Sequence, residues 1–189
     1  MLIAIIGENC VGKSTLAEGI CREIGGKIYN GQDFLRLERN PDNAKATFKA
    51  ILSSAVDGDN LVYVITEREH LDLLPDGAVK IVLTADLDVI KERFKARMRG
   101  ILPPPVEKML EQNHGKYDDL PCDIKLKSGE YNLNEVLEKL KSMGFIVINA
   151  EELTSLPIRK EEYRIGDKDH PSEKAWDAVI DNLIKELNL

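Results

Sequence analysis

The feature that most constrains this chain is the segment GENCVGKS at residues 7–14, together with what flanks it. An uninterrupted apolar run at residues 2–6 comes before it, and apolar residues recur every four positions from Ser14 to Ile24 after it. A short apolar run of this kind is typical of a strand buried on both faces, and the four-residue spacing is helical. A buried strand, a glycine loop and an amphipathic helix, in that order, predict an α/β fold built on a parallel sheet.

The segment itself follows the phosphate-binding pattern G-x-x-x-x-G-K-S. Its glycines let the backbone wrap a phosphate with N–H groups pointing inward, and the helix that follows adds partial positive charge. We expect Lys13 to reach the β- and γ-phosphates of a nucleotide and the Ser14 hydroxyl to ligate Mg²⁺. The strand and the helix on either side argue against a chance match. The predicted nucleotide-binding residues are Gly7, Asn9, Cys10, Val11, Gly12, Lys13, Ser14 and Thr15.

The cysteines indicate a reducing compartment. There are three, Cys10, Cys21 and Cys122, far apart and without a C-x-x-C pair, which excludes a disulfide framework and a cysteine-rich zinc site. Cys10 lies inside the glycine loop near a helix N-terminus, where a thiol can be acidified and reactive. The favoured alternative is a small residue tolerated at a variable position of the loop.

The rest of the chain alternates strand-like and helix-like segments. Strands are predicted at 2–6, 27–29, 61–65, 79–83, 122–126 and 145–148. Helices are predicted at 14–24, 33–54 with a break at 40–41, 86–99, 106–113, about 133–140 and about 172–187, with a loop at 100–105. This order predicts a three-layer αβα fold of the P-loop NTPase type, with a mostly parallel sheet of five or six strands. We expect one domain over 1–189, with a mobile lid at about 97–120 and a C-terminal extension at about 145–189.

Composition narrows the class of partner. The chain has 189 residues, of which 43% are hydrophobic and 31% charged, values typical of a soluble globular protein. A net charge of −7 argues against nucleic acid or an anionic membrane as the partner. We find neither a signal peptide nor an apolar run near the length of a membrane span, so a cytoplasmic location is expected. The sequence leaves the oligomeric state open.

Two polar segments follow the second and third predicted strands, at the sheet edge where α/β proteins bind ligands. Asp33 could orient an acceptor or a metal-bound water, and Arg36 could hold an acceptor anion. Their alternatives are a helix N-cap and a solvated helix residue. Glu67 could hold Mg²⁺ through water and Arg68 could contact the acceptor, unless the two form a plain surface pair.

A basic run at residues 91–99 stands out in this acidic chain. It holds five positive residues and one negative residue and leads directly into the proline-rich loop. The arrangement suits a lid in which Arg93, Arg97 and Arg99 stabilise a transferring phosphoryl group and exclude water. The alternative is a basic helix end favoured by the helix dipole.

Several reaction classes are disfavoured by what the sequence lacks. There is no N-K-x-D to read guanine, and the third strand is not followed by the D-x-x-G of a GTPase switch. His70 and His114 have no metal-ligand partners at suitable spacing, so no zinc site is expected. Residues 167–172 are similar to the D-x-x-H block of SGNH-type hydrolases, but the G-D-S nucleophile of those enzymes is missing. We therefore interpret Asp167 and His170 as a loop and a helix start.

Over about residues 1–140 the chain resembles the P-loop nucleoside and nucleotide kinase group, with cytidylate-kinase-like and guanylate-kinase-like members nearest and shikimate-kinase-type enzymes nearby. The resemblance rests on residues 7–15, the G-Q-D-F-L-R stretch at 31–36, Glu67-Arg68, the segment 79–99, and Tyr117-Asp118 with 122–127. It implies Mg²⁺-dependent phosphoryl transfer from ATP to a small acceptor, favouring a nucleotide or nucleoside. The G-G-G substrate stretch of shikimate kinases is absent, and one extra residue precedes Asp33. A shikimate-type metabolite kinase and a nucleotide-binding regulatory module stay open as alternatives.

Overall fold

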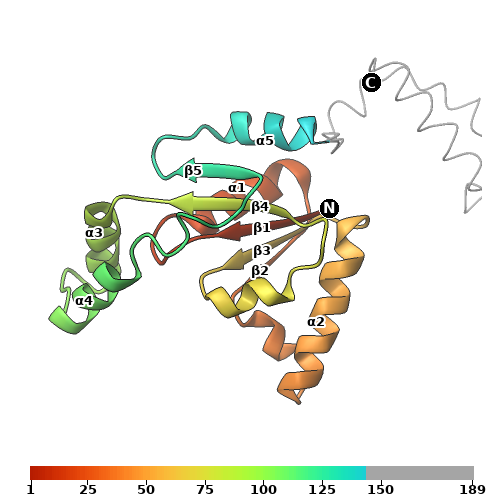
Figure 1. Ribbon diagram of the computed structural model, residues 1–189, viewed down its shortest axis with the longest axis horizontal. Coiled ribbons are helices and arrows are strands. Elements are labelled where there is room, and N and C mark those ends of the chain that lie inside the picture. Colours follow the sequence, from red (N-terminus) through yellow and green to blue (C-terminus); the bar gives the residue numbers. More distant parts are fainter. Residues whose placement is uncertain (144–189) are drawn as a thin grey trace, which may run out of the picture. The chain divides into compact units, whose positions relative to one another are not determined.

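The computed structural model describes residues 1–143 (Figure 1). Within them, five strands form one sheet in which every neighbouring pair is parallel, in the order β2-β3-β1-β4-β5. The strands are β1 (Leu2–Ile6), β2 (Lys27–Asn30), β3 (Leu61–Ile65), β4 (Val79–Thr84) and β5 (Ile124–Lys127). The five predicted strands in this part of the chain are confirmed, β5 starting two residues later than its alternating pattern suggested. The predicted sixth strand, Asp167, His170 and the last helix lie outside the described residues.

Helices cover both faces of the sheet, as the three-layer prediction required. Alternate residues of β1 point to opposite faces, so Ile3 and Ile5 join one core and Leu2, Ala4 and Ile6 the other. The first core also takes the buried faces of α1 (Lys13–Ile24) and α5 (Leu133–Ser142), and the second that of α2 (Pro41–Val56). Because every residue of β1 is buried, the loop that follows it starts from a rigid support.

The predicted break at residues 40–41 is confirmed and has a local cause. A short 3-10 helix, η1 (Asp33–Arg36), precedes α2. The Asn40 side chain caps α2 by accepting hydrogen bonds from the backbone N–H groups of Asp42 and Asn43, and Pro41 supplies a first helical residue that needs no N–H. A second 3-10 helix, η2 (Arg68–Leu73), was not predicted.

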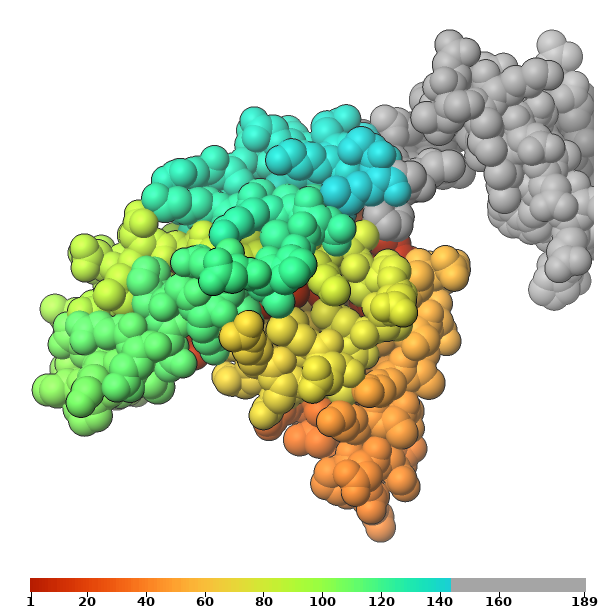
Figure 2. All heavy atoms as spheres, in the orientation of Figure 1, coloured from red at the N-terminus to blue at the C-terminus, as the bar shows by residue number. Residues whose placement is uncertain are grey.

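A helical hairpin made of α3 (Leu87–Arg97) and α4 (Pro104–Asn113) lies at the carboxyl edge of the sheet (Figure 1). Figure 2 shows it standing out from the rest of the described domain. The Lys91 ammonium joins the two helices by donating to Glu107 Oε1 at 2.9 Å and Glu111 Oε1 at 2.6 Å. The prediction of a loop through residue 105 was wrong at its end, because Pro104 and Pro105 fit the first turn of α4, where no N–H is required.

Among residues 1–143 the structure holds no helix long and apolar enough to cross a membrane.

Candidate functional site

The glycine loop has the backbone shape that its sequence predicts. It joins β1 to α1, and Gly12 takes a positive φ of 104°. A Cβ on Gly7 would collide with the carbonyl oxygen of Leu83 in β4, so only glycine fits there. Cys10 also has a positive φ, 64°, although it carries a side chain. Glycine is therefore required where the loop crosses β4, and the loop bends tightly again at residues 10 and 12.

Lys13 is the most buried charged group at this site. Its side chain folds back over the loop, and Nζ donates to the main-chain oxygen of Glu8 at 2.6 Å. Only 7% of the residue is exposed, and this burial lowers the pKa of the Lys13 ammonium to about 8. The nearby cations Lys116 and Arg97 lower the pKa further, while Cys10 and Glu67 oppose them. Positive groups from distant parts of the chain therefore meet at the loop.

A cavity of about 320 Å³ opens beside Lys13. Residues 9, 10 and 12–15 line one side, and the ends of β2 and β3, with Asn30, Gly31, Val64 and Thr66, line another. Arg97, at the end of α3, completes the lining. Six of the eight predicted nucleotide-binding residues meet here. Gly7 and Val11 do not line the cavity, and both residues are buried.

The three arginines of the basic run occupy different places. Arg97 lines the cavity. Arg93 Nη1 donates instead to the loop, reaching the Cys10 carbonyl oxygen at 3.1 Å and the Ser128 hydroxyl, just after β5, at 2.9 Å. Arg99 is exposed, with a positive φ of 58°, in the link between α3 and α4. The structure thus brings Arg93 and Arg97 to the loop and leaves Arg99 outside the cavity.

Asp33 and Arg36 lie on η1 and do not line the cavity. Asp33 Oδ2 accepts a hydrogen bond from the Asn30 backbone N–H at 3.0 Å, and Oδ1 lies 3.7 Å from Arg36 Nη1. The Arg36 side chain is 86% exposed. Arg36 is therefore the solvated helix residue that the sequence left open as its alternative. The N-cap alternative for Asp33 was wrong, because Gln32 takes the N-cap position and Asp33 bonds back to the turn before η1.

Glu67 and Arg68 follow β3 and are exposed beside Thr66, which does line the cavity. The Glu67 charge is close enough to Lys13 to raise the pKa of the ammonium. Across the described residues, 1–143, no group of three or more His, Cys, Asp or Glu side chains is placed to hold a metal ion. The donors at hand are the Ser14 hydroxyl and the Glu67 carboxylate. Such a hard-oxygen set suits Mg²⁺, which takes one or two protein oxygens and completes its shell with water and phosphate.

Four residues near the loop, Glu8, His114, Lys116 and Tyr117, make contacts that the sequence analysis did not predict. Glu8 Oε1 accepts from the Gly115 backbone N–H at 2.6 Å, and Oε2 lies 3.3 Å from His114 Nδ1. Tyr117 is buried, and its hydroxyl donates to the Thr66 carbonyl oxygen. The Lys116 ammonium lies over the Tyr117 ring, 5.0 Å from its centroid. Among these residues Tyr117 alone carried a positive signal, because Tyr117-Asp118 was part of the resemblance, and the segment was interpreted as part of a mobile lid.

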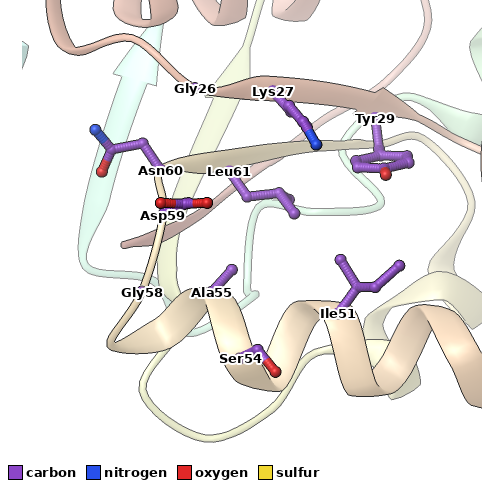
Figure 3. A pocket seen from close by; sticks show the side chains of 10 residues that line it. All are labelled: Gly26, Lys27, Tyr29, Ile51, Ser54, Ala55, Gly58, Asp59, Asn60 and Leu61. Carbon is purple, nitrogen blue, oxygen red and sulfur yellow. The ribbon is translucent and has the colours of Figure 1, made fainter. Parts of the chain in front are cut away.

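A larger cavity, of about 810 Å³, lies at the other end of the strands, between the β2–β3 edge and α2 (Figure 3). In Figure 3 Lys27, Tyr29 and Leu61 come from the strands, and Ile51 and Ala55 from α2. Ligands of open α/β sheets bind at the carboxyl ends of the strands, and this cavity is at the amino ends. Size alone therefore does not make it the site, and the cavity at Lys13 is the candidate.

Comparison with known proteins identifies the fold. No family model and no curated protein matches the sequence. Among solved structures, a gluconokinase from Sinorhizobium meliloti superposes with a TM-score of 0.50 and 18% identity, over 81% of this chain and 95% of its own. The chain has the fold of the P-loop kinases. At this identity the likeness establishes the fold alone, and the predicted α/β P-loop architecture is confirmed.

Two other solved structures with the P-loop kinase fold superpose more loosely. A shikimate kinase from Bacteroides thetaiotaomicron has a TM-score of 0.48 and 13% identity, over 75% of this chain and 97% of its own. A deoxyadenosine kinase from M. mycoides has a TM-score of 0.44 and 15% identity, over 76% of this chain and 98% of its own.

Proposed function

We propose that this protein is an ATP- and Mg²⁺-dependent kinase that phosphorylates a small molecule. The observation that carries the proposal is the meeting, in one cavity, of the buried Lys13, the Ser14 hydroxyl and Arg97. These groups come from the loop, the first helical turn and the helical hairpin. Phosphoryl transfer needs charge compensation from several directions around one phosphate, which this arrangement supplies.

Each group has a role in that reaction. The N–H groups of residues 9–14 would cradle the β-phosphate, and Lys13 would bridge the β- and γ-phosphates. Ser14 would ligate Mg²⁺ and Glu67 would hold one of its waters, and the bound ion would neutralise developing charge on the phosphates. Arg97 would contact the transferring group. Arg93 would hold the loop in shape, and Arg99 would approach only when the hairpin closes.

The acceptor would enter from the ends of β2 and β3. Asn30, Gly31 and Thr66 line that side of the cavity. Asp33, Arg36 and Arg68 do not line the cavity and would position the acceptor only after local rearrangement, because their present contacts are with the turn or with solvent. A nucleotide or nucleoside is the acceptor that the resemblance favours.

A specific observation favours a second acceptor class, a small hydroxylated metabolite. The aromatic side chains on the acceptor half, Phe34, Phe48 and Tyr63, are buried in the core beneath η1 and α2. Among the described residues that line the cavity, none is aromatic. A nucleobase acceptor normally gains much of its binding energy by stacking on such rings, whereas a polyol needs hydrogen bonds alone.

A nucleotide and acceptor panel tests the function. We expect ATP with Mg²⁺ to raise the unfolding temperature, and one acceptor class to yield ADP and a phosphorylated product. Lys13→Ala should abolish product formation. The matched control is Lys27→Ala, which removes an exposed lysine at the opposite end of the sheet and should change neither result. Tight ATP binding without product from any acceptor would instead identify a regulatory module, and full turnover by Lys13→Ala would refute the kinase.

A further inference from the structure

Glu8 places a carboxylate inside a loop shaped for phosphate, where a negative charge opposes the ligand. The structure shows both of its oxygens turned toward another segment. Oε1 accepts from the Gly115 N–H at 2.6 Å, and Oε2 lies 3.3 Å from His114 Nδ1. Only 13% of the Glu8 side chain is exposed, so these contacts replace most of its solvent. The carboxylate therefore joins the phosphate loop to the segment that returns from α4.

That returning segment places Lys116 next to Gly115, the residue that Glu8 holds. Gly115 turns with a positive φ of 80°, which few other residues adopt. Tyr117, two residues on, is fixed by burial and by its hydrogen bond to Thr66. Lys116 lies between these two fixed points with its ammonium over the Tyr117 ring, close enough to Lys13 to lower the pKa of that group.

The same residue also orients Lys13. The Lys13 ammonium donates to the main-chain oxygen of Glu8, while the Glu8 side chain holds Gly115. Lys13 and Lys116, which are far apart in the sequence, are thereby both positioned by Glu8. Two like charges repel each other, so they stay together only if the backbone of each is held.

We propose that Glu8 is a positioning residue, which keeps Lys116 beside Lys13 so that both ammonium groups bind the terminal phosphate of the nucleotide. This rests on the proposed nucleotide site and assigns to Lys116 a phosphate-binding role. Glu8 itself touches no phosphate. It acts through the Gly115 turn.

A double-mutant cycle on nucleotide affinity tests the coupling. Glu8→Ala and Lys116→Ala should each weaken ATP binding about tenfold, the size of one lost charged contact, and should leave adenosine binding unchanged. If Glu8 acts through Lys116, the double variant should be no weaker than either single variant. Losses that multiply to about a hundredfold would overturn the proposal, because two independent contributions would then be at work.

Amide hydrogen exchange at Gly115 tests the contact without any need for turnover. Glu8→Ala should speed exchange of the Gly115 amide at least about tenfold, because its hydrogen-bond acceptor is gone. Glu8→Gln is the matched variant, since its amide oxygen can still accept that bond, and it should keep the slow exchange and most of the ATP affinity. Unchanged exchange in Glu8→Ala, or a Glu8→Gln variant as weak as Glu8→Ala, would refute the positioning role.

The outcomes separate this inference from the kinase proposal. If the variants show the coupling but the protein forms no phosphorylated product, the positioning role is supported and the kinase proposal is refuted. If the protein forms product but the Glu8 and Lys116 variants lose ATP affinity independently, the kinase proposal is supported and the positioning role is refuted. One that binds no ATP refutes both.

Discussion

At the scale of single residues, the tightest steric constraints described above lie in the glycine loop. Gly7 passes so close to Leu83 that a side chain has no room, and Gly12 takes a left-handed conformation that favours glycine. Lys13 is buried against the loop that it serves. The sequence predicted the glycine loop and a role for Lys13, because these residues are contiguous, but not the burial of Lys13 or the close approach of Gly7 to Leu83. The contacts of Glu8, Lys116 and Tyr117 were not predicted, because they arise only when residue 115 returns to residue 8 through the fold.

The first prediction concerns Gly7. Gly7→Ala should lower the free energy of unfolding by about 2 kcal/mol, because the new methyl group meets the backbone of β4, which cannot move aside cheaply. ATP binding should weaken as well. The control is Gly19→Ala, whose methyl group meets only the movable Leu133 side chain at 3.1 Å. Urea unfolding of both variants measures the difference, and a Gly7→Ala cost no greater than that of Gly19→Ala would contradict this reading of the structure.

The second prediction concerns pH and Lys13. Its pKa is about 8 in the folded protein, against 10.5 for an unperturbed lysine, so between these pH values the unfolded chain binds more protons. The free energy of unfolding should therefore be lowered fully by the buried charge below pH 8, and it should rise as the pH increases toward 10.5. Lys13→Met, which removes that charge, should melt at a higher temperature than the natural protein at pH 7. Thermal melts at pH 7, 8.5 and 10 should show this gap narrowing, and a constant gap would contradict the burial argument.

At the scale of elements, the helical hairpin behaves as one unit. Lys91 on α3 donates hydrogen bonds to both Glu111 and Glu107 on α4. These bonds raise the pKa of the Lys91 ammonium, and the bond to Glu111 has the larger effect. Leu110 adds a buried apolar contact. The hairpin also presents exposed apolar residues, Met98 and Ile101, in the link between its helices. If the hairpin moves when a nucleotide binds, we therefore expect α3 and α4 to move together.

The third prediction follows from the Lys91 contacts. Lys91→Met keeps the length of the side chain and removes its charge, so α4 should loosen from α3 while the sheet stays intact. Limited proteolysis should cut faster within residues 98–103, and the melting temperature should change little because the contacts are partly exposed. Lys95→Met on the same helix serves as the control. Equal cutting of the two variants would show that Lys91 does not join the helices.

The sequence predicts this level of structure well where a signal is local. A local pattern was sufficient to predict several elements: the apolar runs predicted β1 and β3, the four-residue spacing predicted α1, and Asn40-Pro41 predicted the start of α2. The start of α4 was misjudged because prolines at residues 104 and 105 favour a loop or a first helical turn equally, and only Leu110 packing on the core decides. The helix η2 carries no periodic pattern, and it forms because His70 and Leu73 are buried against neighbouring elements.

At the scale of the whole molecule, charge is unevenly distributed. The chain carries −7 overall, yet Lys13 and Arg97 line one cavity, Arg93 bonds to the loop, and Lys116 is near enough to lower the pKa of Lys13. An acidic body limits nonspecific contacts with polyanions, while the local cations would suit the small phosphate ligand that we propose. Of the cations that the sequence analysis assigned to the site, the fold brings Lys13 and Arg97 to the cavity and Arg93 to the loop, and it leaves Arg36, Arg68 and Arg99 outside the lining.

The fourth prediction concerns the extent of the folded unit. Both cores and all five strands of the described sheet lie within residues 1–143, and α5 closes the first core with Leu140 fully buried. We expect a chain that ends at residue 143 to fold cooperatively and to keep its affinity for ATP within about threefold, because the residues that line the cavity are all retained. Circular dichroism melts and nucleotide titration measure this. A shortened chain without a cooperative melt would place essential packing beyond residue 143.

The position of β1 also matters for how the protein is made. Of the described strands it leaves the ribosome first, but it sits in the middle of the sheet, paired with residues 61–65 on one side and 79–82 on the other. Its five apolar residues cannot have both edges covered until residues 79–82 have been synthesised. Pairing over such sequence distances slows folding and leaves an apolar, unpaired strand that can aggregate with other nascent chains. Its assembly should therefore be more sensitive to the speed of translation and to chaperones than that of a domain whose first strand forms a hairpin.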